Sequence, residues 1–137
     1  MRYVFDTSLP LRVARLLDAY DADHEVLSLG ETDVDPRAPD RAILDALRSQ
    51  DPPPVFLTTD PGRETNAQAR AVLTQSGLTV VFLRRGWNNL PFHTQAVKLL
   101  TIWPKLVTET SRVKEPTAFE ITPSARKVQR LGPTADL

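Results

Sequence analysis

The sequence predicts one α/β domain whose central sheet is mostly parallel. Short apolar runs alternate along the chain with segments whose apolar residues recur at helical spacing, an order typical of strand, helix, strand units. At 137 residues the chain can bury a core without a disulfide or a structural metal. Because it has no cysteine, any metal site must use oxygen ligands or the two histidines.

The first half of the chain is expected to contain three strands and two helices. Residues 3–5 form a β-prone run that ends at Asp6, and apolar residues at helical spacing then predict a helix. The remaining expected elements are a strand at residues 26–29, a helix from residue 40 and a strand at residues 55–57. The acidic, proline-containing stretch before the second helix predicts a loop, and the prolines that follow this helix end it.

The second half is expected to contain two more helices and two more strands. The expected elements are a helix at residues 64–75, a strand at residues 80–83, an amphipathic helix from residue 92 to residue 103 and a late strand at residues 118–121. Gly77 ends the first of these helices, and Pro104 is expected to stop or kink the second. We therefore expect a main domain over residues 1–110 and an extension over residues 111–137, with one further strand and a basic tail.

The composition argues against a membrane protein. No uninterrupted apolar run approaches the roughly 20 residues that cross a bilayer, and the chain opens on a strand instead of a basic and apolar leader. We expect a soluble, cytoplasmic protein with no membrane partner.

The zero net charge conceals two oppositely charged halves. Residues 1–64 hold 7 basic and 13 acidic side chains, whereas residues 65–137 hold 10 basic and 4 acidic ones. A protein that binds both a cation and a polyanion could use such a division. The alternative is that charge segregates by chance on solvated faces.

Three aspartates occupy positions typical of a metal site. Asp6 and Asp60 each follow an apolar strand, and ligands usually bind beyond the carboxyl ends of strands in a parallel sheet. Asp40, at the start of a helix, can be aimed at the same crevice. Clustered carboxylates repel one another unless a cation is present, so we expect Mg²⁺ or Mn²⁺. The alternatives are a helix cap for Asp40 and a turn for Asp60.

These residues resemble the short PIN-like domains, which include VapC-type toxins of VapBC toxin–antitoxin systems. The resemblance extends in element order over residues 2–107. The matching positions are Val4-Phe5-Asp6, Leu9-Pro10, Pro39-Asp40 with Ile43-Leu44, and Val55 to Asp60. It implies a three-layer α/β/α fold, metal coordination and catalysis by Asp6, Asp40 and Asp60, and a position near the metal for Thr58 or Thr59.

The chain departs from the family pattern in three places. Thr7 and Ser8 stand where the family often has Glu and Asn, and residues 61–63 intervene before Glu64, which could replace the family's second acid after Asp60. The family's glutamate between the first and middle Asp has no clear match, since Glu31 lies in a predicted loop.

Basic residues that could contact RNA follow the acidic candidates. Arg63, Arg84 and Arg85 are expected at the same edge, and Arg126, Lys127 and Arg130 belong to the basic tail. The alternative is that these basic side chains are only part of a solvated surface and contact no RNA. Trp87 could stack a base, although Trp more often anchors a loop by packing.

The expected function is that of a metal-dependent endoribonuclease, the toxin of a toxin–antitoxin pair. Its expected partners are RNA, an antitoxin protein and a second copy of the chain, paired through the helix around Leu99 to Trp103. The main alternative is a catalytically inactive PIN-like interaction module. A receiver-type signalling domain is a more distant one, because it needs an acidic pair after the first strand and a late strand-end lysine.

Overall fold

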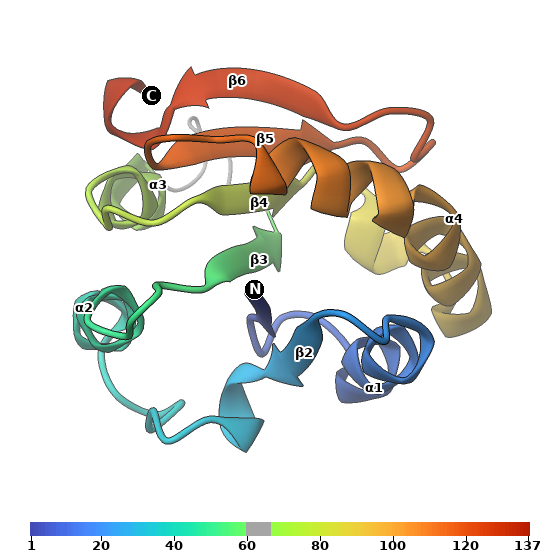
Figure 1. Cartoon of the computed structure of the whole chain (residues 1–137), viewed down its shortest axis with the longest axis horizontal. Coiled ribbons are helices and arrows are strands. Elements are labelled where there is room, and N and C mark those ends of the chain that lie inside the picture. The colour runs from blue at the N-terminus through green and yellow to red at the C-terminus, as the bar shows by residue number, and fades with distance from the viewer. Residues whose placement is uncertain (60–66) are drawn as a thin grey trace.

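The computed structural model describes residues 1–59 and 67–137, and these form one mixed sheet with helices on both faces (Figure 1). The sheet of the described residues has six strands in the order β2-β1-β3-β4-β5-β6. They are β1 (Arg2–Phe5), β2 (Glu25–Ser28), β3 (Val55–Thr59), β4 (Val80–Leu83), β5 (Thr117–Ile121) and β6 (Gln129–Pro133). Only β6 is antiparallel to its neighbour, so the predicted α/β class with a mostly parallel sheet is confirmed.

The helices of the described part of the chain form an outer layer on each face of the sheet, as Figure 1 shows. They are α1 (Leu11–Tyr20), α2 (Asp40–Arg48), α3 (Ala67–Thr74) and α4 (Phe92–Ser111). One buried cluster joins the sheet to α1 and α4, and a second joins it to α2 and α3. Side chains alternate between the two along each strand. In β1, Tyr3 and Phe5 belong to the first cluster and Val4 to the second.

The second strand ends earlier than its apolar run predicts. Leu29 was expected to be in the strand, but it begins a 3₁₀ helix at Leu29–Glu31. The turn is held by its own polar groups: the hydroxyl of Thr32 donates to the carbonyl of Leu29 at 2.7 Å, and the Glu31 carboxylate accepts from the N–H of Ser28 at 3.0 Å. Leu29 is nevertheless 1% exposed, so the apolar pattern indicated burial correctly and backbone conformation incorrectly.

Pro104 does not stop α4, which continues to Ser111. Proline inside a helix costs about 3 kcal/mol, through a missing N–H and a clash with the preceding turn. Trp103 and Leu106 flank it and are at most 1% exposed, and each such buried side chain contributes roughly 1.5–3 kcal/mol. Packing against the sheet therefore outweighs the cost of the proline.

Two expectations about the C-terminal half need correction. The stretch after residue 122, expected as a basic tail, contains β6, and β5 is an interior strand between β4 and β6. Leu99 and Trp103, expected to pair in a dimer, are each 1% exposed because they face the chain's own core. These two side chains are therefore unavailable for contact with a second copy.

No helix within residues 1–59 or 67–137 combines the length and the apolar character needed to cross a membrane.

Candidate functional site

The candidate site lies where the strand order reverses. From β1 the chain places β2 on one side, and β3 and the later strands on the other. β1 and β3 are therefore the neighbouring strands at which the sheet order reverses, and the crevice beyond the carboxyl ends of such a pair is the usual ligand site of an open parallel sheet. A pocket of about 200 Å³ lies at this point. Its lining residues are Asp6, Asp40, Ile43, Leu44, Phe56, Thr58, Thr59, Ala69, Val72 and Leu73.

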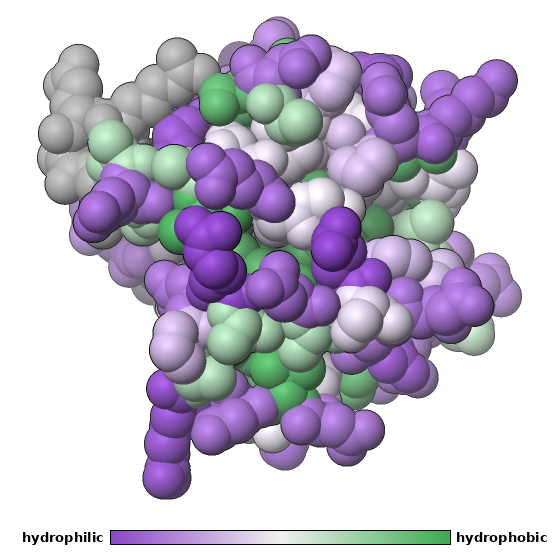
Figure 2. Space-filling view, turned by 90° about the vertical axis from the view of Figure 1, so that its left-hand side faces the viewer, coloured by the Kyte–Doolittle hydropathy of each residue, from purple (hydrophilic) through white to green (hydrophobic). Residues whose placement is uncertain are grey.

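The pocket has one polar side and one apolar side. Carboxylates and hydroxyls come from the strand ends and from the start of α2, whereas α2, α3 and Phe56 supply the apolar side. Figure 2, which looks onto the side of α2 and α3, shows apolar surface framed by hydrophilic side chains. The lining therefore suits a ligand with both a charged and an apolar part.

The Asp6 carboxylate accepts four hydrogen bonds, of which the one from the Thr7 hydroxyl to Oδ1 is long at 3.5 Å. Its Oδ1 accepts from the backbone N–H of Thr7 at 2.8 Å. Its Oδ2 accepts from the hydroxyls of Ser8 at 3.0 Å and Thr58 at 2.8 Å. Thr58 is 4% exposed and belongs to the neighbouring strand β3, so the orientation of Asp6 depends on the pairing of β1 with β3.

Strand alternation explains why these two residues meet. Asp6 follows Phe5, and Thr58 follows Leu57, and both apolar residues face α1 and α4. The next residue in each strand points to the opposite face, toward α2 and α3. Because Phe5 and Leu57 are in register, Asp6 and Thr58 extend from adjacent positions into the same pocket.

Asp40 lines the same pocket from the first turn of α2. The N-cap of this helix is Pro39, which makes no side-chain cap hydrogen bond. Among the described residues the Asp40 carboxylate has no hydrogen-bond or ion-pair partner, so the structure gives no support to the capping role considered as an alternative. Its charge still favours the helix through the dipole, by roughly 0.3–1 kcal/mol.

Three predicted site residues, Asp60, Arg63 and Glu64, lie outside the described residues. In the described ranges no group of three or more acidic or histidine side chains is placed to hold a metal ion. The two carboxylates that line the pocket, those of Asp6 and Asp40, are oxygen donors of the kind that Mg²⁺ and Mn²⁺ prefer.

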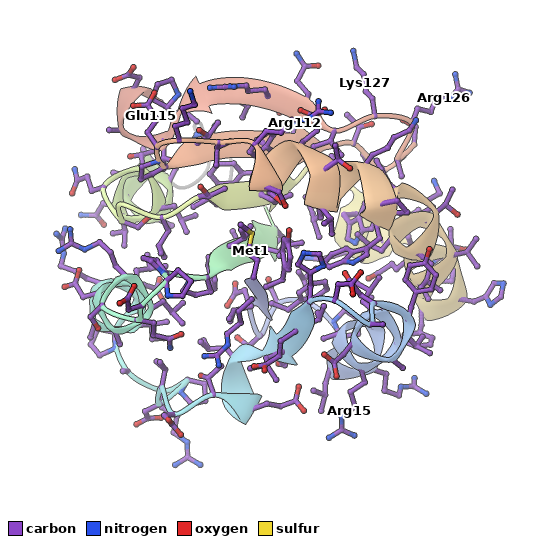
Figure 3. The ribbon with its side chains drawn as sticks, in the orientation of Figure 1. Met1, Arg15, Arg112, Glu115, Arg126 and Lys127 are labelled. Atoms are coloured by element: carbon purple, nitrogen blue, oxygen red, sulfur yellow. The ribbon has the colours of Figure 1, made fainter. Side chains whose placement is uncertain are left out.

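The predicted RNA-contacting residues lie in different environments. Arg84 donates to the Glu120 carboxylate at 2.8 Å, whereas Arg85 follows it in an exposed turn. Arg126 and Lys127 project from the connection between β5 and β6 (Figure 3). Arg130 is exposed on β6. None of these five side chains lines the pocket.

Trp87 is 0% exposed, so it cannot stack a base. It packs in the cluster that joins α4 to the sheet, as the alternative interpretation proposed. Gly86, whose φ is +95°, turns the chain so that the indole points inward.

A second polar cluster, missed in the sequence, lies at the C-terminal end of α1. The Asp21 carboxylate accepts from the indole N–H of Trp103 at 2.9 Å and lies 3.1 Å from Nδ1 of His24. Burial by itself would raise the pKa of Asp21, but hydrogen bonds from Trp103, the Asp23 N–H and His24 outweigh it and lower this pKa. Because α1 runs back along the sheet, this cluster is at the edge opposite the pocket, and it ties α1 to α4.

Comparison with family models, with curated proteins and with solved structures finds no match for this chain. The PIN-like resemblance therefore rests on the residues themselves. The functional assignment depends on the pocket at the carboxyl edge.

Proposed function

We propose that the protein is a metal-dependent endoribonuclease of the PIN-like class, which hydrolyses RNA phosphodiester bonds with Mg²⁺ or Mn²⁺ held by Asp6, Asp40 and Asp60. One observation carries the proposal. Asp6 and Asp40, which are distant in the sequence, line one pocket at the point where the strand order reverses. Carboxylate oxygens that reach one pocket from two different elements are the kind of donor set that Mg²⁺ and Mn²⁺ prefer.

The chain's own residues would divide the work in this site. When bound, the ion lowers the pKa of a bound water and neutralises charge that develops on the phosphate. Thr7, Ser8 and Thr58 fix the Asp6 carboxylate in one orientation, while Asp40 approaches from the start of α2. The apolar side of the pocket would receive the base of the nucleotide next to the cleaved bond, because the flat faces of a base are apolar.

Exposed basic side chains would hold the rest of the RNA. Arg126, Lys127 and Arg130 carry charge on the β5–β6 hairpin, and Arg85 follows the end of β4. Contacts to phosphates are independent of sequence, so these residues would contribute affinity and not specificity. The toxin role and the antitoxin partner are proposed from the resemblance alone. A homodimer and a cytoplasmic location are proposed from the sequence pattern alone.

The inactive PIN-like module remains the second candidate, and the hydrogen bonds of Asp6 favour it. Donors from Thr7, Ser8 and Thr58 already satisfy this carboxylate, as an interaction module would require. The strand order β2-β1-β3-β4-β5 is also that of receiver-type folds. However, Thr7 follows Asp6 and Thr122 follows β5, so both the acidic pair and the lysine of a receiver are missing.

Cleavage of end-labelled RNA tests the proposal. Purified protein is incubated with RNA in EDTA, Mg²⁺ or Mn²⁺, and compared with Asp6→Asn and Asp40→Asn. Asp45→Asn is the matched control, because Asp45 is exposed on α2 and does not line the pocket. We expect metal-dependent cleavage that both pocket variants lose and the control keeps. Equal cleavage by a folded Asp6→Asn protein would exclude the proposed site, and Mn²⁺ binding without cleavage of any RNA would favour the inactive module.

A further inference from the structure

The β2 edge of the sheet has an unusual arrangement of backbone hydrogen bonds. Within the described part of the chain β2 is a terminal strand, so one of its two sides has no neighbouring strand there. The N–H of Glu25 donates to the carbonyl of Met1, which shows that Glu25 faces β1. Because successive residues alternate, the N–H groups of Val26 and Ser28 face outward. These are the two donors that an added strand would use.

Both outward donors are already bound by carboxylates. The N–H of Val26 donates to Oδ1 of Asp18 at 2.9 Å, and the N–H of Ser28 donates to Oε1 of Glu31 at 3.0 Å. Val26 is 2% exposed and Ser28 is 7% exposed, so neither N–H has ready access to water as a substitute partner.

The two carboxylates come from different elements that flank the strand. Asp18 lies on α1, and Glu31 ends the 3₁₀ helix that follows β2. Arg15, which extends outward from α1 in Figure 3, has its Nε 3.6 Å from Oε2 of Glu31. Arg15 and Asp18 are one helical turn apart on α1. This helix therefore supplies the Asp18 carboxylate itself and, through Arg15, holds the Glu31 carboxylate in place.

We infer that Asp18 and Glu31 close the β2 edge against strand addition, both to a second copy of this chain and to an extended segment of a protein partner. An incoming strand would have to displace two charge-assisted hydrogen bonds and leave two carboxylates against its own carbonyl oxygens. The other terminal strand is also a poor template. β6 ends at Pro133, which has no N–H, and its register with β5 shifts beside Ala118. A protein partner would therefore dock elsewhere than at the β2 edge.

Amide hydrogen exchange tests each cap directly. In Asp18→Ala we expect the Val26 amide to exchange roughly tenfold faster or more, with Ser28 little changed, and the reverse in Glu31→Ala. Asp18→Asn and Glu31→Gln should keep most of the protection, because the amide oxygen still accepts. Asp33→Ala is the matched control, since Asp33 is exposed near the same edge and caps neither amide. Unchanged exchange in the alanine variants would overturn the capping inference.

The oligomeric state tests whether the two caps prevent a second copy from pairing with β2. Light scattering across a concentration series should show that the double variant Asp18→Ala/Glu31→Ala forms larger species than the wild type. The Asn/Gln double variant should match the wild type. In the larger species the amides of Val26 and Ser28 should regain protection, because a strand now covers them. A folded alanine double variant with wild-type association, or larger species in which these amides stay unprotected, would refute closure of the edge.

Discussion

Replacing Asp6 with Asn tests whether hydrogen bonds or like-charge repulsion dominate the energetics of the pocket. Repulsion alone predicts that the variant is more stable than the wild type in the absence of metal. The structure predicts the opposite sign. The Thr7 N–H is a fixed donor, so the Asn oxygen must take the place of Oδ1, and its NH₂ then faces the hydroxyls of Ser8 and Thr58. Hydroxyls can rotate to accept, so the number of bonds is kept while their ionic character is lost.

The two effects can be compared in magnitude. A hydrogen bond to a charged group contributes about 1.5–3 kcal/mol and a neutral one about 0.5–1.5 kcal/mol, so weakening the three shorter bonds would cost about 3–4.5 kcal/mol in a fully buried site. Asp6 is only half-buried, so solvent screening reduces this cost to about 1–2 kcal/mol. Removing the repulsion between Asp6 and the exposed Asp40 stabilises the variant by less than about 1 kcal/mol. We expect a net loss of about 1 kcal/mol, which for a chain of this size lowers the melting temperature by roughly 3–5 °C.

The assay is thermal unfolding followed by circular dichroism, first in EDTA and then with Mn²⁺. In EDTA the Asp6→Asn variant should melt below the wild type. Asp40→Asn should melt close to the wild type, because it loses no side-chain hydrogen bond and because the lost helix-dipole interaction is offset by relief of repulsion from Asp6. At a Mn²⁺ concentration of about 100 times its Kd the wild type gains about 2.7 kcal/mol, and Asp6→Asn should gain almost none. A variant that is more stable than the wild type in EDTA would refute the hydrogen-bond argument. A full Mn²⁺ response in the variant would show that Asp6 is not a ligand.

Three further predictions concern the opposite edge, the pocket wall and the basic hairpin. The folded-state pKa of Asp21 is lowered, so its stabilising contribution is present above the unfolded pKa of about 3.9 and is lost as pH falls through the lower folded value. The stability difference between wild type and Asp21→Asn, measured by urea unfolding, should therefore shrink below about pH 4; a constant difference down to pH 2 would contradict this. Val72→Phe should fill the apolar side of the pocket and reduce RNA cleavage at least about tenfold while Mn²⁺ affinity stays the same, and a loss of both would indicate a general distortion. Neutralising Arg126, Lys127 and Arg130 together should lower RNA affinity and reduce the salt slope by about 2 for single-stranded RNA, and an unchanged slope would assign these residues to another role.

Much of the architecture follows from local pattern. The apolar run that ends at Asp6, the helix that begins at Asp40 and the buried strand β4 match their predicted positions closely. Each of these signals involves neighbouring residues only: apolar periodicity, a proline at a boundary, or a charge directly after an apolar run. Predictions from such local patterns are correct at these positions because the backbone preference and the burial of the side chains favour the same element.

Of the three predicted acids of the candidate site, two can be placed in the structure, and Asp60 lies outside the described residues. Asp6 and Asp40 follow from strand and helix ends, and they do line one pocket. The bond from Thr58 to Asp6 depends on the pairing of β1 with β3, which no local pattern encodes. Ser8 left a weak signal, since a hydroxyl two residues after an aspartate is well placed to bond to it.

The sequence by itself determined the α/β class, the order of the strands and helices as far as residue 121, and most of the apolar positions of the core. Tertiary contacts decided which secondary-structure element holds several of those residues. Pro104 stays inside a helix because Trp103 and Leu106 pack against the sheet, and Leu29 is buried in a turn instead of a strand. The residues around 130 form an edge strand because β5 offers a partner. The physical reason is common to all three: periodicity reports the environment of a side chain, whereas the backbone conformation that reaches this environment is chosen by contacts between segments distant in the chain.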